Sequence, residues 1–173
     1  MWTMRPRLWQ FHCIRNTLWY VSCDGEMKIK EITENKKQYR SLLLLADEQE
    51  SMIDRYLDRG TMYVLEDDGI KCECVVTDEG NGILEIKNIA TDPGCQRRGY
   101  GKIMLEFVAE KYKDRYDILQ VGTGDSPLTI PFYENCGFVY SHRIEDFFTE
   151  HYDHPIYENG VRLTDMIYLR KRL

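Results

Sequence analysis

The chain has 173 residues, of which 43% are hydrophobic and 30% are charged, and its formal net charge at pH 7 is -6. This length suits one globular domain that buries about two thirds of its unfolded surface. An acidic balance without a dense Lys/Arg stretch, apart from Arg170–Arg172, argues against nucleic acid as a partner. The longest apolar run, 42–46, is far shorter than the ~18 residues of a membrane span, so a membrane is not expected either.

The cysteines read as free thiols of a cytoplasmic protein. They stand at positions 13, 23, 72, 74, 95 and 136, in a chain too large to depend on disulfides and without a clear secretion signal. Cys72-x-Cys74 could be half of a metal site. No second Cys or His pair has the matching spacing, however, and alternation along a strand favours buried core thiols. His151 and His154 lie in a stretch predicted to be a loop, so no metal is expected there.

Residues 1–26 differ from the rest of the chain. They contain all three tryptophans, show no sustained helical or alternating period, and are interrupted by arginines where a signal peptide would need an apolar run. A strand-like segment begins directly afterwards at Met27. The hypothesis is that 1–26 form an atypical N-terminal extension that is not native, and that 27–173 form the domain.

The remaining elements follow in a simple order. A strand at 27–32 precedes two amphipathic helices, at 38–47 and 49–59. Strands at 62–66 and 70–77 are joined by Asp67-Asp68-Gly69, a hairpin signal. A strand at 83–91, a glycine-bearing loop, a helix at about 102–114 and a strand at 118–121 complete the pattern. This order predicts an α+β fold with helices packed against a sheet.

The loop at 92–101 carries the strongest chemical signal. Gly99 and Gly101 precede a helix whose first amides have no intrahelical partner, and such amides bind phosphate together with the helix dipole. A Walker loop would need Ser or Thr where Ile103 follows Lys102, and a dinucleotide fingerprint would need a third glycine. From the loop alone, a simple turn stays open as an alternative.

Two segments carry a family resemblance. Gln96-Arg97-Arg98-Gly99-Tyr100-Gly101 resembles the Gln/Arg-x-x-Gly-x-Gly/Ala signature of the GNAT acetyltransferases, and the tract at 131–138, Pro-Phe-Tyr-Glu-Asn-Cys-Gly-Phe, resembles the second signature of that family. The resemblance covers nearly all of the chain after residue 26. It implies an acetyl-CoA-dependent N-acetyltransferase with a mixed, mostly antiparallel twisted sheet, flanked by helices, whose splayed central strands hold the acetyl group.

The resemblance also assigns roles to single residues. The pyrophosphate of acetyl-CoA, the co-substrate, would lie on the backbone from Arg97 to Lys102, and the pantetheine would pair with a strand. Tyr133 matches the tyrosine that protonates the departing thiolate, and a neutral phenol suits that task. The residues expected to bind acetyl-CoA are Ile89, Ala90, Thr91, Gln96, Arg97, Arg98, Gly99, Tyr100, Gly101 and Lys102.

The sequence offers more than one role for the residue that could take a proton from the acceptor amine. Glu85 has the spacing before Gln96 at which histone acetyltransferases of this family place their catalytic glutamate. Alternation would equally let Glu85 pair with Lys87 on a solvated strand face. Asp125 is a second candidate for orienting the acceptor, with a turn role as the alternative. Ser126 stands where the family often has Asn, which leaves the start of the following helix open, as late as Ile130.

The sequence does not identify the acceptor amine. Five acids interleaved with aromatics between Glu145 and Glu158, with no Lys or Arg among them, would suit a cationic small-molecule or peptide amine. A solvated acidic loop is the alternative. The competing functions are a non-catalytic acetyl-CoA sensor or structural module and a nucleotide-binding regulator. The sequence also allows a homodimer.

Overall fold

A computed structural model describes residues 11–14, 17–22 and 25–173. Among these residues nine strands form one sheet in the order β1-β2-β3-β4-β5-β6-β7-β11-β8, and β9 and β10 form a separate pair. Every neighbouring pair is antiparallel except β6 and β7, which are parallel. The strands are β1 (Phe11–Ile14), β2 (Thr17–Ser22), β3 (Gly25–Ile32), β4 (Thr61–Glu66), β5 (Ile70–Asp78), β6 (Ile83–Thr91), β7 (Ile118–Gly124), β8 (Val139–Ile144), β9 (Tyr157–Glu158), β10 (Val161–Arg162) and β11 (Met166–Arg172).

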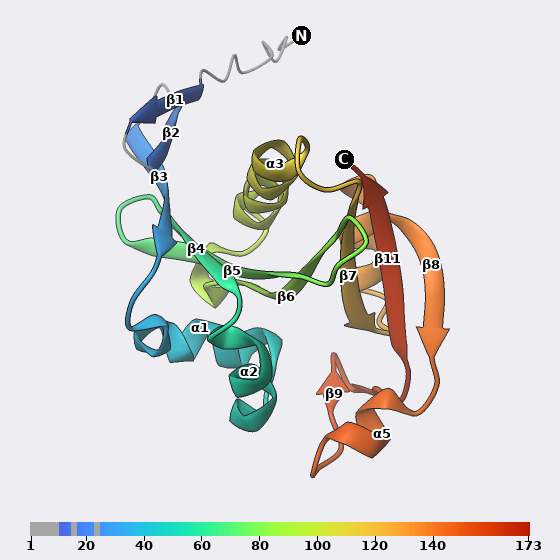
Figure 1. Cartoon of the computed structure of the whole chain (residues 1–173). Helices are drawn as coiled ribbons and strands as arrows, with labels where there is room; N and C mark the ends of the chain where they lie inside the picture. The colour runs from blue at the N-terminus through green and yellow to red at the C-terminus, as the bar shows by residue number, and fades with distance from the viewer. Residues whose placement is uncertain (1–10, 15–16, 23–24) are drawn as a thin grey trace, which may run out of the picture.

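Helices cover both faces of this sheet. Figure 1 shows α3 on one face and α1, α2 and α5 on the other. The helices are η1 (Lys36–Tyr39), α1 (Arg40–Ala46), α2 (Glu50–Leu57), η2 (Pro93–Cys95), α3 (Tyr100–Tyr112), α4 (Thr129–Asn135) and α5 (Phe147–His151). None of the described helices has both the length and the apolar composition that crossing a membrane requires. The predicted α+β class is confirmed.

Separate apolar clusters anchor the two helical layers. Met104, Phe107 and Val108 of α3 pack on the apolar face of the central strands, and Tyr133 of α4 belongs to the same cluster. Leu43 of α1 and several residues of α2 pack on the opposite face, over β4 and β5. The central sheet is therefore buried on both sides, and access to it depends on where neighbouring strands separate.

The predicted central elements are confirmed, with ends shifted by a few residues. The hairpin turn after β4 contains Asp68 at φ 52° and Gly69 at φ 93°, the left-handed backbone that tight hairpin turns use. α4 begins at Thr129, so Pro131 lies in the first turn, where an amide has no intrahelical partner to lose. Ser126 accepts a hydrogen bond from the Leu128 amide at 3.2 Å, a turn contact that precedes the helix and does not cap it.

One expectation needs correction. The stretch containing His151 is predicted to be a loop, yet residues 147–151 form the short helix α5, because Phe148 is buried against Ile156 and Leu163. The described part of residues 1–26 contributes β1, β2 and the start of β3 to the sheet edge. The rest of that extension lies outside the described residues, and its status as an extension stays a prediction.

Candidate functional site

The parallel strands β6 and β7 separate partway along their length. They pair only from Ile83 with Ile118 to Ile86 with Val121, although both strands continue beyond these positions. The other edge of β6 stays paired with β5, and the register shifts opposite Val75 and Val76 so that Lys87 forms a bulge. The edge of β6 that faces β7 is consequently open over residues 87–91. Ile89, Ala90 and Thr91 all lie in this open stretch.

The glycine loop ends in a backbone conformation suited to an anion. Arg97 has φ 60° and Gly99 has φ 91°, and α3 begins at the next residue, Tyr100. Successive amides in such a loop point to one side and form an anion-binding concavity at the helix N-terminus. A Cβ placed on Gly99 would meet no atom within 4 Å, so the space beside Gly99 is open. The loop can therefore accept a phosphate group.

The side chains of this loop are exposed or make few contacts with the rest of the protein. Gln96 Nε2 donates a 3.4 Å hydrogen bond to the Thr91 carbonyl, and the Arg98 guanidinium lies 5.7 Å from the centre of the Tyr100 ring. The Tyr100 hydroxyl donates to Asp67 at 2.8 Å, which ties the first turn of α3 to the β4–β5 hairpin. Lys102 Nζ lies 3.8 Å from Glu106 on the exposed face of α3. Arg98 and Lys102 thus keep their cationic groups at the surface.

Tyr133 lies on the same face of the sheet as α3. Its side chain is 6% exposed and meets Phe132 and Phe138 edge-on, with ring centres 5.1 Å and 5.6 Å away. Burial, and to a smaller degree the thiols of Cys74 and Cys136, raises the pKa of the Tyr133 phenol above its usual value. The phenol is therefore neutral near pH 7 and has a proton to donate.

Glu85 lies where β6 and β7 are still paired, on the face opposite α3. Its carboxylate accepts hydrogen bonds from Lys87 Nζ at 2.6 Å and from Gln120 Nε2 at 2.7 Å. The expected pairing with Lys87 is present, but the side chain is only 6% exposed, so the surface is not a solvated one. Both carboxylate oxygens are held by protein donors, which fixes the orientation of the group.

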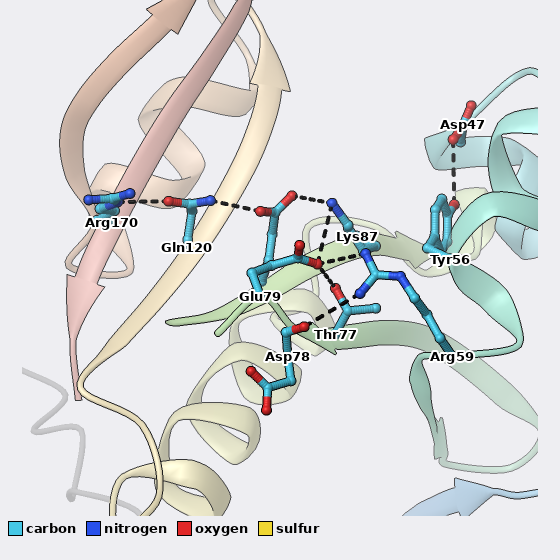
Figure 2. Close-up of polar contacts among 10 residues, drawn as sticks. Asp47, Tyr56, Arg59, Thr77, Asp78, Glu79, Lys87, Gln120 and Arg170 are labelled. Carbon is cyan, nitrogen blue, oxygen red and sulfur yellow. Dashed lines mark hydrogen bonds and ion pairs between the residues drawn. The ribbon is translucent and has the colours of Figure 1, made fainter. Parts of the chain in front are cut away.

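Glu85 belongs to a longer row of polar side chains crossing the sheet, of which Figure 2 labels Arg170, Gln120 and Lys87. Gln120 of β7 accepts a 2.7 Å hydrogen bond from Arg170 of β11, and Lys87 also lies 3.7 Å from Glu79, which in turn bonds Arg59 at 2.7 Å. Sequence reasoning missed Gln120 and Arg170. The signal for Gln120 was a polar residue inside an otherwise apolar strand.

Other candidate residues have structural partners. Asp125 pairs with Arg143 of β8 at 2.6 Å, an exposed ion pair. Cys72 and Cys74 are fully buried in the core, as predicted, and burial raises the pKa of the Cys72 thiol to about 12. His151 bonds the Phe147 carbonyl while His154 bonds Asp153. Within the part of the chain that the structure describes, no group of His, Cys, Asp or Glu is arranged to hold a metal ion.

Comparison with known proteins identifies the family. The model of the acetyltransferase (GNAT) domain matches residues 58–140. The chain is 33% identical over 147 residues to the uncharacterized N-acetyltransferase YvbK of Bacillus subtilis, covering 83% of this chain and 95% of that protein. This chain belongs to the GNAT acetyltransferase family. The resemblance found in the two sequence signatures is confirmed, and the splayed strands and glycine loop are those of a GNAT enzyme.

Solved structures of other GNAT proteins agree in fold. A GNAT family acetyltransferase from Elizabethkingia anophelis with acetyl-CoA bound is 35% identical, with a TM-score of 0.80 over 85% of this chain and 98% of the other. A Bacillus subtilis acetyltransferase in complex with CoA is 34% identical, with a TM-score of 0.78 over 85% of this chain and 99% of the other. The mixed, mostly antiparallel sheet flanked by helices is thus shared with acetyltransferases.

Proposed function

We propose that this GNAT protein transfers an acetyl group directly from acetyl-CoA to a primary amine of a cationic acceptor. The observation that carries the proposal is the open edge of β6 over residues 87–91, which leads from the Glu85 cluster to the glycine loop before α3. One site therefore offers backbone groups for an extended chain and an anion cradle at its end. The two relatives with known structures contain acetyl-CoA and CoA respectively, which supports the same ligand here.

The residues that hold the co-substrate follow from this geometry. The amides from Arg97 to Lys102 bind the pyrophosphate, because they lack helical partners and meet open space beyond Gly99. The main chain of Ile89, Ala90 and Thr91 pairs with the pantetheine along the open edge of β6. Bound acetyl-CoA supplies the activated acetyl thioester between β6 and β7.

Tyr133 and Glu85 divide the proton transfers between the two faces of the sheet. Tyr133, on the α3 face, would donate a proton to the departing CoA thiolate, which leaves as the free thiol, since burial keeps its phenol neutral. Glu85, on the opposite face, receives the proton that an ammonium must lose before it can react. Lys87 and Gln120 hold the Glu85 carboxylate in place for that role.

A cationic acceptor is supported by the charge of the segment beside this opposite face. Glu145, Asp146, Glu150 and Asp153 are exposed there, and Glu158 is half-buried. Exposed carboxylates raise the local concentration of a cation, and this attraction weakens as salt is added.

Thermal unfolding tests the donor site directly. We expect CoA and acetyl-CoA to raise the melting temperature while ATP and NAD leave it unchanged, because a ligand at 100 times its Kd stabilises the native state by about 2.7 kcal/mol. Release of free thiol upon addition of a panel of primary amines then measures turnover. A melting temperature that none of the CoA compounds raises would reject the proposed function, and CoA binding without thiol release would favour a sensor.

A further inference from the structure

The face of the sheet opposite α3 has a second flank on the β7 side of the opening. Gly122 and Gly124 of β7 point to this face, since they alternate with Gln120. A Cβ added at Gly124 would come within 2.4 Å of Leu163, and one at Gly122 within 2.6 Å of the Met166 sulfur. The segment that carries α5, β9 and β10 therefore lies directly over β7, on the face where Glu85 lies.

The β6 side of the opening is flanked by α1 and α2. Asn88 follows the bulge in β6, and its Nδ2 group donates to the Leu43 carbonyl at 3.0 Å and to the Tyr56 hydroxyl at 2.8 Å. Tyr56 in turn lies 3.5 Å from Asp47 in the turn between the two helices, a contact that Figure 2 shows. This flank is thus tied to the strand that forms one side of the opening.

Hydrogen bonds join the two flanks across the opening. The Tyr152 hydroxyl donates to Asp47 Oδ1 at 3.1 Å, and the Asp153 amide donates to Gln49 Oε1 at 3.1 Å. The residues in each contact are more than 100 positions apart in the sequence. Because α3 and the glycine loop occupy the other face, an acceptor must approach the open edge of β6 on the side that these contacts span.

The segment over β7 has a small apolar core of its own. Phe148, Ile156 and Leu163 form a small apolar cluster of their own, separate from the two clusters under α3 and α1. Of its two hydrogen bonds to the α1–α2 turn, the one from Asp153 to Gln49 is exposed and the one from Tyr152 to Asp47 is half-buried, and such peripheral contacts open at lower free energy than the core. Loss of these two hydrogen bonds therefore loosens the contact with the α1–α2 turn, while Leu163 stays packed against Gly124 of β7.

We propose that Tyr152 and Asp47 form a specificity-determining latch, which admits slender primary amines while closed and excludes bulky ones. The proposal rests on the proposed acetyl transfer, since it concerns the acceptor side of the same site. Tyr152 reaches the strand at the opening through Asp47, Tyr56 and Asn88. It is a positioning residue that limits which amine reaches the thioester.

Variants of the full chain test the latch. Tyr152→Phe removes one hydroxyl and keeps the ring, while Asp47→Ala removes the shared acceptor. We expect hydrogen–deuterium exchange, measured with acetyl-CoA bound, to become on the order of tenfold faster at residues 46–50 and 147–156 in both variants. The double variant should exchange at the rate of Asp47→Ala alone, since Asp47→Ala already removes the contact that Tyr152→Phe breaks. Tyr157→Phe, an exposed tyrosine in the same segment, is the matched control.

Two primary amines of different bulk test the specificity role. We expect kcat/KM for cyclohexylamine relative to n-propylamine to rise several-fold in Tyr152→Phe and in Asp47→Ala, and to stay unchanged in Tyr157→Phe. Exchange rates equal to those of the control would overturn the latch. A failure of both variants to gain activity toward cyclohexylamine would overturn its role in specificity. Thermal stabilisation by acetyl-CoA, retained in all variants, separates either result from a failure of the donor site.

Discussion

The hydroxyl of Tyr133 has a different setting from those of other tyrosines in the same core. Tyr63 and Tyr112 share a 2.8 Å hydrogen bond between their hydroxyls, a structural contact within the α3 layer. Tyr133 is equally buried, but it follows β7 on α4 and faces the thiol-rich side of β5. The Tyr133 hydroxyl is thus the candidate for the proposed acid role, whereas the Tyr63 and Tyr112 hydroxyls bond each other.

Replacing Tyr133 with Phe should separate catalysis from binding. The ring and its contacts with Phe132 and Phe138 are retained, so we expect the Kd for acetyl-CoA to stay within about twofold while kcat falls on the order of a hundredfold, the usual size of a general-acid contribution. Steady-state thiol release and calorimetric titration measure the two quantities. Tyr112→Phe, the same change in the same core, should lower stability but leave kcat intact. A Tyr133→Phe protein with normal turnover would exclude the acid role.

At the scale of elements, the hairpins, helices and glycine loop could be predicted because each depends on local sequence. Asp68-Gly69 supplies the left-handed turn, and Gly99 and Gly101 mark the start of α3. The separation of β6 from β7 was expected only through the family resemblance, because it depends on the bulge at Lys87 and on pairing across the sheet. The contact of Tyr152 with Asp47 was not predictable, since nothing local links residues 105 positions apart.

The glycine loop can be tested without disturbing its surroundings. Gly99 has φ 91° and a Cβ there would meet no atom, so Gly99→Ala strains the backbone by about 1 kcal/mol without a clash. We expect the loop to relax and the Kd for acetyl-CoA to rise on the order of tenfold, because the amides no longer converge on the pyrophosphate.

Gly80→Ala is a close control for Gly99→Ala. Gly80 has φ 78°, a Cβ there would also meet no atom within 4 Å, and it follows the C-terminal end of β5. Both variants should lose a similar free energy of unfolding in a denaturant titration, while calorimetry should find weaker acetyl-CoA binding in Gly99→Ala alone. Equal effects on the Kd would show that the Gly99 conformation is structural rather than ligand-binding.

For the whole molecule, one buried carboxyl should govern how stability depends on pH. Glu73 on β5 is fully buried between the sheet and α1, and neither carboxyl oxygen accepts a hydrogen bond of normal geometry from the described residues. Asn88, which lies on β6 opposite Val75, also has an unpartnered buried oxygen. Burial raises the pKa of Glu73 to about 8, with the nearby Ala90 amide opposing, so the carboxyl is largely protonated at neutral pH.

The sign of the effect follows from proton binding. Between pH 4.5, the ordinary value, and about 8, the unfolded chain has released this proton while the folded protein keeps it. The contribution of Glu73 to the free energy of unfolding is therefore fully present below pH 4.5. It declines by up to roughly 1.4 kcal/mol per pH unit until about pH 8, where it levels off.

Glu73→Gln is neutral at every pH, so we expect its free energy of unfolding to lack this decline. The advantage of the variant over the native protein should grow from pH 5 to pH 8 in urea titrations. Glu34→Gln, a change at an exposed site, controls for the loss of one charge. Parallel pH profiles for native protein and Glu73→Gln would mean that Glu73 is ionised in the folded state and that a water or a shift of α1 stabilises its charge.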